Sequence, residues 1–197
     1  MIEFQLIFII ILYSIVQSFY GVGILLLGTP TLIYFEYSFI DTLNILIPPS
    51  ITISIIQIFT TGINKNKNNL IIYKKNFLLL CLPSIFCGLF IVTKIYDDIN
   101  FNYLIAITII ILLAFLKIKY LNNFISYFFN KYLKIFHILI GIIHGLTNMG
   151  GSFLSIYVSE ITNQNTFDRR YLIAYSYFYM SLIQIITLYL TEKFFFN

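Results

Sequence analysis

The longest uninterrupted feature of the chain is a run from Phe4 to Phe35 that contains no Asp, Glu, Lys, Arg or His. Apolar runs of about 18 or more residues are typical of helices that span a bilayer. A straight helix over this whole run would be on the order of 48 Å long, whereas the hydrocarbon core is ~30 Å thick. The run must therefore break, tilt or bend back, and the glycines and proline between Gly21 and Pro30 are where an interruption costs least.

The composition places the whole chain in the membrane class. Of its 197 residues 59% are hydrophobic and 10% are charged, whereas a soluble domain carries roughly 25% charged residues. This excludes a soluble globular protein, and a β-barrel is disfavoured because barrel strands alternate in polarity over about 10 residues. We predict an all-α integral membrane protein with about six transmembrane helices, of which two are broken by glycine. The expected segments are 4–35, 42–63, 76–93, 99–116, 135–159 and 171–191, with an interfacial helix at 120–129 and a kink or restart at Pro48-Pro49.

The distribution of lysine predicts the topology. Two loops rich in lysine and lacking acids flank the third and fourth segments, and the positive-inside rule makes both cytoplasmic. If every segment crosses once, the N-terminus is cytoplasmic and Arg169-Arg170 lie outside, against the same rule. Alternatively, the fifth segment is re-entrant and the arginine pair lies inside. The lysines are Lys65, Lys67, Lys74 and Lys75 in one loop, and Lys117, Lys119, Lys131 and Lys134 in the other.

A second glycine-rich interruption occurs at 144–153, and the sequence around it resembles the first. Gln57 and Gln184 each follow an aspartate by sixteen residues, within Ser54-Ile55-Ile56-Gln57-Ile58 and Ser181-Leu182-Ile183-Gln184-Ile185. We therefore predict a single membrane domain with an internal repeat. Its first copy is 1–134, four helices plus the interfacial piece, and its partial second copy is 135–197, two helices. Four segments separate the starts of the two copies, so parallel repeats are expected. Glycine-broken segments at matching places indicate a transport site.

At these interruptions the chain resembles the TauE/SafE sulfite exporter family, the sulfonate-uptake permease group. The likeness lies in Gly21-Val22-Gly23 through Gly28-Thr29-Pro30, and in Gly145-Leu146-Thr147-Asn148-Met149-Gly150-Gly151-Ser152. The resemblance implies a permease that moves sulfite, a sulfonate or a related organic anion across the cytoplasmic membrane. It also implies two four-helix halves, so this chain would be a shortened member whose second half is completed by another copy or by a partner chain.

The predicted substrate site lies where the two interruptions meet. Helix N-termini exposed at a break offer unpaired N–H groups and the positive end of the helix dipole to an anion. The alternative is that the glycines only allow close helix packing and that the glutamines join helices. The candidate substrate-binding residues are Gly21, Gly23, Gly28, Thr29, Gln57, His144, Gly145, Asn148, Gly150, Gly151, Ser152 and Gln184.

Other polar residues have both a functional and a structural interpretation. His137 and His144 lie seven residues apart, on one helical face, where they could relay a proton or could bind backbone carbonyls. Arg169 and Arg170 could attract anions to an outer mouth or anchor to lipid headgroups. No enzyme, metal or cofactor motif is recognised, and no nucleic-acid partner is expected. The partners are a small anion and the bilayer, and the remaining alternatives are a non-transporting membrane subunit or scaffold and an intramembrane enzyme.

Overall fold

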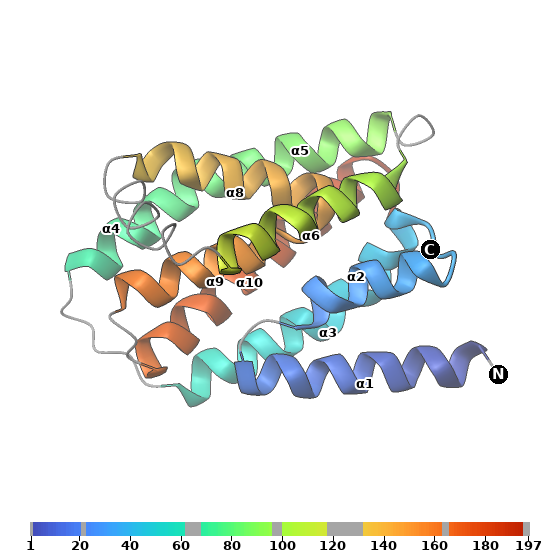
Figure 1. Ribbon diagram of the computed structural model, residues 1–197, viewed down its shortest axis with the longest axis horizontal. Coiled ribbons are helices and arrows are strands. Elements are labelled where there is room, and N and C mark those ends of the chain that lie inside the picture. The colour runs from blue at the N-terminus through green and yellow to red at the C-terminus, as the bar shows by residue number, and fades with distance from the viewer. Residues whose placement is uncertain are drawn as a thin grey trace.

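A computed structural model describes residues 2–20, 23–61, 68–95, 100–117, 132–162 and 166–194, and within these ranges it is helical and contains no strand (Figure 1). The prediction of an all-α fold is confirmed. The helices are α1 (Ile2–Tyr20), α2 (Ile24–Tyr34), α3 (Phe39–Thr60), α4 (Asn68–Asn76), the π-helix η1 (Phe77–Cys81), α5 (Leu82–Lys94), α6 (Phe101–Lys117), α8 (Leu133–Thr147), α9 (Gly150–Ile161) and α10 (Thr166–Leu190).

The length and the apolar composition of these helices indicate a multi-pass membrane protein. Among the described residues, 3 helices are long and apolar enough to cross a membrane: Phe39–Thr60, Leu70–Lys94 and Phe167–Leu190. Shorter apolar helices accompany them at Phe4–Tyr20, Ile24–Tyr34, Phe101–Ala114 and Leu133–Thr147. Large apolar side chains also cover the outside of the bundle, as Phe59 at 85% exposure and Tyr103 at 71% illustrate. A surface of this kind suits lipid.

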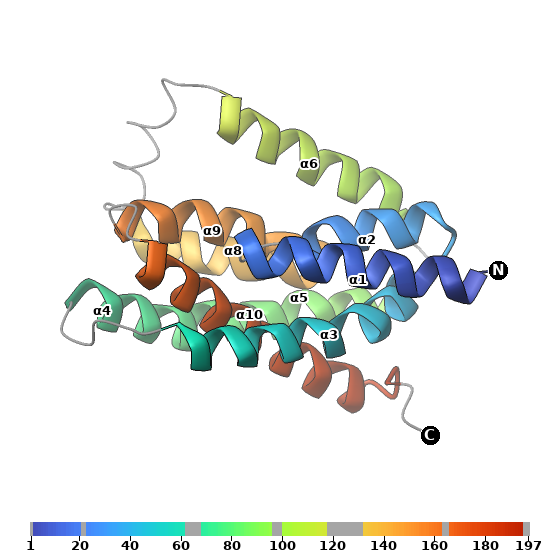
Figure 2. The same ribbon diagram turned by 90° about the horizontal axis from the view of Figure 1, so that it is seen from below.

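Each glycine-broken segment folds into a helical hairpin instead of crossing once. Figures 1 and 2 show α1 running from the N-terminus along the bundle and α2 returning toward the end where α1 began. In the same views α8 enters from the other end, and α9 returns to that end. The two hairpins therefore point in opposite directions. The expectation of parallel repeats is wrong, because it counted each broken segment as one crossing.

The long helices α3 and α10 pack against each other at the centre and run in opposite directions (Figure 2). The start of α3 meets the end of α10, where Asn44 Nδ2 donates to the carbonyl oxygen of Lys193 at 3.0 Å. Phe39 stacks on Phe101 of α6 with ring centroids 4.6 Å apart. Helix α3 is continuous through Pro48-Pro49, so the expected restart does not occur there.

A single long helical stretch made of α4, η1 and α5 forms the third long crossing, and it begins well before the predicted start at residue 76. Its π-helical turn, Phe77–Cys81, directly precedes Pro83. Proline cannot donate to the residue four positions earlier and its ring crowds that carbonyl, so a widened turn relieves the conflict. The predicted interfacial helix at 120–129 lies outside the described residues.

The basic residues of α4 and α10 lie at one end of the bundle, called here the lysine end and defined by Lys74, Lys75 and Arg170. Lys74 Nζ lies 3.4 Å from the Tyr171 hydroxyl and 4.7 Å from the centre of that ring. Arg170 Nη2 donates to the carbonyl oxygen of Phe19, at the end of α1, at 3.0 Å. The arginine pair thus sits with the lysines, as the re-entrant alternative for the fifth segment requires.

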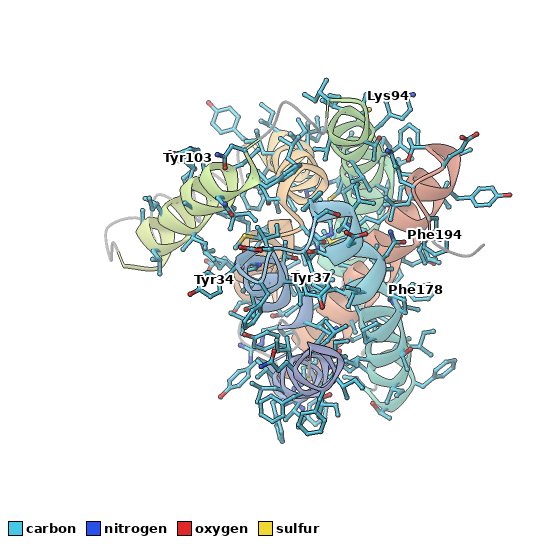
Figure 3. All side chains as sticks on the ribbon, turned by 90° about the vertical axis from the view of Figure 1, so that its right-hand side faces the viewer. Tyr34, Tyr37, Lys94, Tyr103, Phe178 and Phe194 are labelled. Carbon is cyan, nitrogen blue, oxygen red and sulfur yellow. The ribbon has the colours of Figure 1, made fainter. Side chains whose placement is uncertain are left out.

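The opposite end of the bundle holds the chain termini. Figure 1 places the N- and C-terminal ends there, and Figure 3 looks onto that end, with Lys94 and Phe194 labelled. In the same view Tyr103 points away from the bundle, because α6 stands apart from the other helices (Figures 2 and 3). The fold therefore brings the two hairpins together at the centre and separates the lysine end from the termini.

Candidate functional site

The first interruption is closed by two buried glutamines. Gln17 Oε1 accepts from the backbone N–H of Ile24, the first residue of α2, at 3.2 Å. Gln57 Nε2 donates to the carbonyl oxygens of Gln17 at 3.0 Å and of Ser18 at 3.3 Å. A Cβ on Gly23 would lie 2.8 Å from the Gln17 nitrogen, so this turn has no room for a side chain. Gly21 lies outside the described residues.

The second interruption depends on the backbone conformation of Asn148. Helix α8 ends at Thr147, and Asn148 follows with φ 61° and ψ 8°, the left-handed conformation. Asparagine tolerates this conformation better than most residues other than glycine. Its N–H donates to the His144 carbonyl oxygen at 2.8 Å, and the N–H of Met149 donates to Thr147 Oγ1 at 3.2 Å. The chain then turns directly into α9.

A chain of buried hydrogen bonds joins the two interruptions. Asn148 Nδ2 donates to Thr29 Oγ1 at 2.8 Å, and Gln184 Nε2 donates to Asn148 Oδ1 at 3.0 Å. Thr29 Oγ1 in turn donates to the Leu25 carbonyl oxygen at 2.7 Å. Thr29, Asn148 and Gln184 are at most 1% exposed. The structure thus brings together three of the residues that the sequence suggested, from α2, the α8–α9 turn and α10.

The imidazole of His144 lies beside this chain of hydrogen bonds. It is 0% exposed, it neighbours the Gln184 side chain, and neither ring nitrogen meets hydrogen-bond geometry with a described partner. His137 differs, because its Nδ1 lies 2.8 Å from the Leu133 carbonyl oxygen. The backbone-carbonyl interpretation therefore applies to His137, while His144 keeps free hydrogen-bonding capacity next to Gln184.

The N-terminus of α9 is buried and carries no side-chain cap. The first amides of a helix have no partner within that helix, and no described side chain accepts from the N–H groups of Gly150 and Gly151. Ser152 Oγ donates to the Met149 carbonyl oxygen at 2.6 Å, so this hydroxyl is engaged locally. A Cβ on Gly151 would collide with the Tyr177 hydroxyl. The absence of a side chain here allows Tyr177 to approach the buried first turn of α9.

Two predicted site glycines instead make packing contacts. A Cβ on Gly145 would lie 2.5 Å from the Ile85 carbonyl oxygen and 2.7 Å from the Leu89 nitrogen. Gly145 thus sets the close approach of α8 to α5. A Cβ on Gly28 would meet the Leu46 Cδ1 methyl at 2.9 Å. The packing alternative describes both positions.

The serines and glutamines that align between the two predicted repeat copies lie in similar, buried surroundings. Their side chains are at most 8% exposed. Each copy leaves a serine hydroxyl and a glutamine Oε1 without a partner that meets hydrogen-bond geometry in the described part of the chain. These residues are Ser54 and Gln57 on α3, and Ser181 and Gln184 on α10. The bundle centre therefore keeps hydrogen-bonding groups that a polar ligand could use.

Two residues at the site were missed in the sequence. Gln17 is 0% exposed and completes the first interruption, while Tyr177 is 1% exposed and lies against Gly151. A signal for Gln17 existed, because an amide inside an uncharged apolar run is as unusual as Gln57 or Gln184. Tyr177 carried no such signal among so many tyrosines.

The side chains that meet at the two interruptions carry no formal charge and can form hydrogen bonds. The side chains that meet there are amides, hydroxyls and an imidazole, without a lysine, arginine or carboxylate among those described. Among the described residues no group of His, Cys, Asp and Glu could hold a metal ion. Two pockets, of about 780 Å³ between η1 and α8 and about 450 Å³ between α1 and α2, are not lined by residues of the interruptions. The side chains of Thr29, Asn148 and Gln184 are buried where the interruptions meet.

Comparison with known families covers nearly the whole chain. The family model described as "Sulfite exporter TauE/SafE" matches residues 6–195. No curated protein and no solved structure matches the chain.

Proposed function

Because the chain belongs to the TauE/SafE sulfite exporter family, we propose that it carries sulfite, a sulfonate or a related small organic anion across the cytoplasmic membrane. The family is one of membrane transporters rather than enzymes. The proposal adds a substrate site to this family function: the N-terminus of α9 together with Asn148, Gln184 and His144.

The observation that carries the proposal is the hydrogen bond between Asn148 and Thr29. It joins a residue of the α8–α9 turn to a residue of α2, and α2 and α9 are the returning arms of the two hairpins. Transporters with repeated halves bind substrate where broken helices of the halves meet, with half-helix N-termini directed at anionic groups. The N-terminal amides of Gly150 and Gly151, which no described side chain caps, would supply that arrangement at α9.

The two interruptions then have different tasks. Gln17 already caps the N-terminus of α2, so this hairpin acts mainly as the partner surface. The N-terminus of α9 offers its backbone amides to the anion, and the amide group of Gln184 can turn from Asn148 to the substrate. Passage of an anion requires the Thr29–Asn148 contact to open. We propose that one hairpin rocks against the other at this contact and that His144 accompanies the step as a proton carrier.

The orientation follows from charge. The positive-inside rule makes the lysine end cytoplasmic, which places the N-terminus on the opposite side and revises the expectation drawn from six single crossings. We further propose that the chain functions together with a second copy. The division of the chain into repeats after residue 134 stays a prediction.

The test is sulfite flux into proteoliposomes made with the purified full chain. We expect the wild type to move sulfite, and Asn148→Ala and Gln184→Leu each to reduce the flux about tenfold or more. The reason is that a hydrogen bond to a charged group contributes roughly 1.5–3 kcal/mol. Ser155→Ala is the matched control, because the Ser155 hydroxyl donates to the Ser152 carbonyl oxygen within α9 and not to Asn148 or Gln184.

Thermal unfolding of each purified variant separates misfolding from lost transport. Folded Asn148→Ala and Gln184→Leu proteins that move sulfite at the wild-type rate would place the site elsewhere. A folded wild type that moves neither sulfite nor sulfonates would remove the transport proposal itself.

A further inference from the structure

A groove opens on the side of the bundle at the lysine end, between α4–η1 and the start of α8. Its volume is about 780 Å³, and Lys75 and Asn76 line it from one side and Lys134 from the other. Leu79 and Ile135 contribute to its apolar lining. The groove is separate from the interruptions and belongs to no step of the proposed transport.

The two lysines of the groove are available to a ligand. Both are exposed, and neither ammonium group forms an ion pair or hydrogen bond within the described part of the chain. The neighbouring Lys74 differs, because it lies over the Tyr171 and Tyr175 rings at 4.7 and 4.8 Å from their centres. Lys75 and Lys134 therefore present two positive charges at the rim of an otherwise largely apolar groove.

The groove begins at the level of the lipid headgroups, where its lysines lie, and extends to the level of the acyl chains, where its apolar residues lie. Lys75 and Lys94 lie on one long helical stretch, about 28 Å apart at 1.5 Å per residue, close to the ~30 Å thickness of a hydrocarbon core. Lys75 thus sits near one membrane surface. Leu79, which is 62% exposed, lies one turn deeper, and Ile135, which is 51% exposed, follows Lys134 in the same direction.

We propose that this groove binds an anionic phospholipid. The phosphate lies between the Lys75 and Lys134 ammonium groups, and an acyl chain lies along Leu79 and Ile135. Basic pockets between helices on the cytoplasmic side of a membrane suit such headgroups. The apolar floor favours a lipid over a soluble phosphate, because a soluble ion would leave Leu79 and Ile135 without a partner.

The experiment measures lipid binding to the purified full chain in detergent, by native mass spectrometry and by the shift of the unfolding temperature. Phosphatidylglycerol and phosphatidylcholine with identical acyl chains are compared. We expect phosphatidylglycerol to bind and to stabilise the protein more than phosphatidylcholine. Since each basic residue near a membrane surface contributes about fivefold in affinity, the double variant Lys75→Gln/Lys134→Gln should bind phosphatidylglycerol roughly 25-fold more weakly.

Lys94→Gln is the matched control, because it removes one charge at the opposite end of the same helical stretch and should leave binding unchanged. Equal binding of phosphatidylglycerol by the double variant would overturn the proposal, as would equal loss in Lys94→Gln. Glycerol phosphate, which lacks acyl chains, is the further probe. If it stabilises the protein as much as the lipid does, the groove binds a soluble phosphate and the lipid assignment is wrong.

Discussion

Asn148 has two separable tasks at the centre of the molecule. Its backbone makes the left-handed turn that ends α8, and its side chain links Thr29 to Gln184. Glycine at this position would keep the turn and lose the side-chain bonds, whereas alanine would lose both. Few residue types satisfy both requirements, which explains why an asparagine, and not another glycine, stands within a glycine-rich stretch.

This separation gives a prediction at the residue scale. Asn148→Ala should lower the free energy of unfolding by about 2–4 kcal/mol, from the lost bonds and the left-handed conformation. Asn148→Gly should be about 1–2 kcal/mol more stable than Asn148→Ala, and both should lose sulfite flux. Unfolding in mixed micelles measures the stabilities. Equal stability of the two variants would show that the conformation of residue 148 does not limit the fold.

At the scale of elements, glycines decide how closely the helices approach. Gly88 and Gly145 lie at the contact of α5 with α8, each facing backbone atoms of the other helix, and Gly141 of α8 faces the backbone of Cys81 at the end of η1. In a membrane, small residues of this kind allow the dispersion contacts that hold helices together. The contact fixes α8, and therefore the start of the second interruption, against the long helix that contains α5.

Replacement of these glycines should have graded effects. Gly145→Ala places a Cβ 2.5 Å from the Ile85 carbonyl oxygen, and rigid backbone cannot yield, so we expect a loss of about 1–3 kcal/mol in unfolding free energy. Gly28→Ala meets a movable Leu46 methyl at 2.9 Å, and alanine favours helix over glycine by about 1 kcal/mol. Its stability should change by about 1 kcal/mol or less. Micelle unfolding compares the pair, and an equal loss in both would contradict the packing assigned to Gly145.

At the scale of the whole molecule, the two hairpins enter from opposite ends and meet at one buried contact (Figures 1 and 2). The long helix α3, the long helical stretch of α4, η1 and α5, and α10 run the length of the bundle, whereas α6 stands apart from it (Figure 2). This arrangement reverses the direction of the second copy relative to the first. It also places Arg170 beside the end of α1, at the lysine end.

The arrangement predicts the accessibility of single cysteines. In a background with Cys81 and Cys87 replaced by alanine, Lys94→Cys should react with a membrane-impermeant maleimide in intact cells. Arg169→Cys should react only after permeabilisation if the lysine end faces the cytoplasm, as we propose from the positive-inside rule. Labelling of Arg169→Cys in intact cells would contradict this orientation, and a cysteine in place of Lys75 serves as the reference for the cytoplasmic side.

The positions of the helix breaks could be predicted from the sequence, because they depend on the backbone preferences of a few neighbouring residues. The helix breaks at Gly23 and Asn148 follow from glycine and asparagine in apolar runs, and both breaks are present. The continuity of α3 could not be predicted from the sequence, because two adjacent prolines would interrupt an isolated helix. In the bundle α3 packs against α2 and α10 and stays helical through Pro48-Pro49. The role of Gln17 was missed for a related reason: its partner, the Ile24 amide, becomes reachable only after the hairpin closes.

Apolar run length and charge distribution by themselves determined that this protein is helical, that it lies in a membrane, and where its backbone breaks, because bilayer thickness and glycine chemistry act on short stretches. Only the tertiary structure decided that the broken segments turn back, that the two hairpins run in opposite directions, and that Thr29, Asn148 and Gln184 meet. Those outcomes depend on which helices pack together, and a side-chain contact such as Asn148 to Thr29, 119 positions apart, exists only once the bundle has formed.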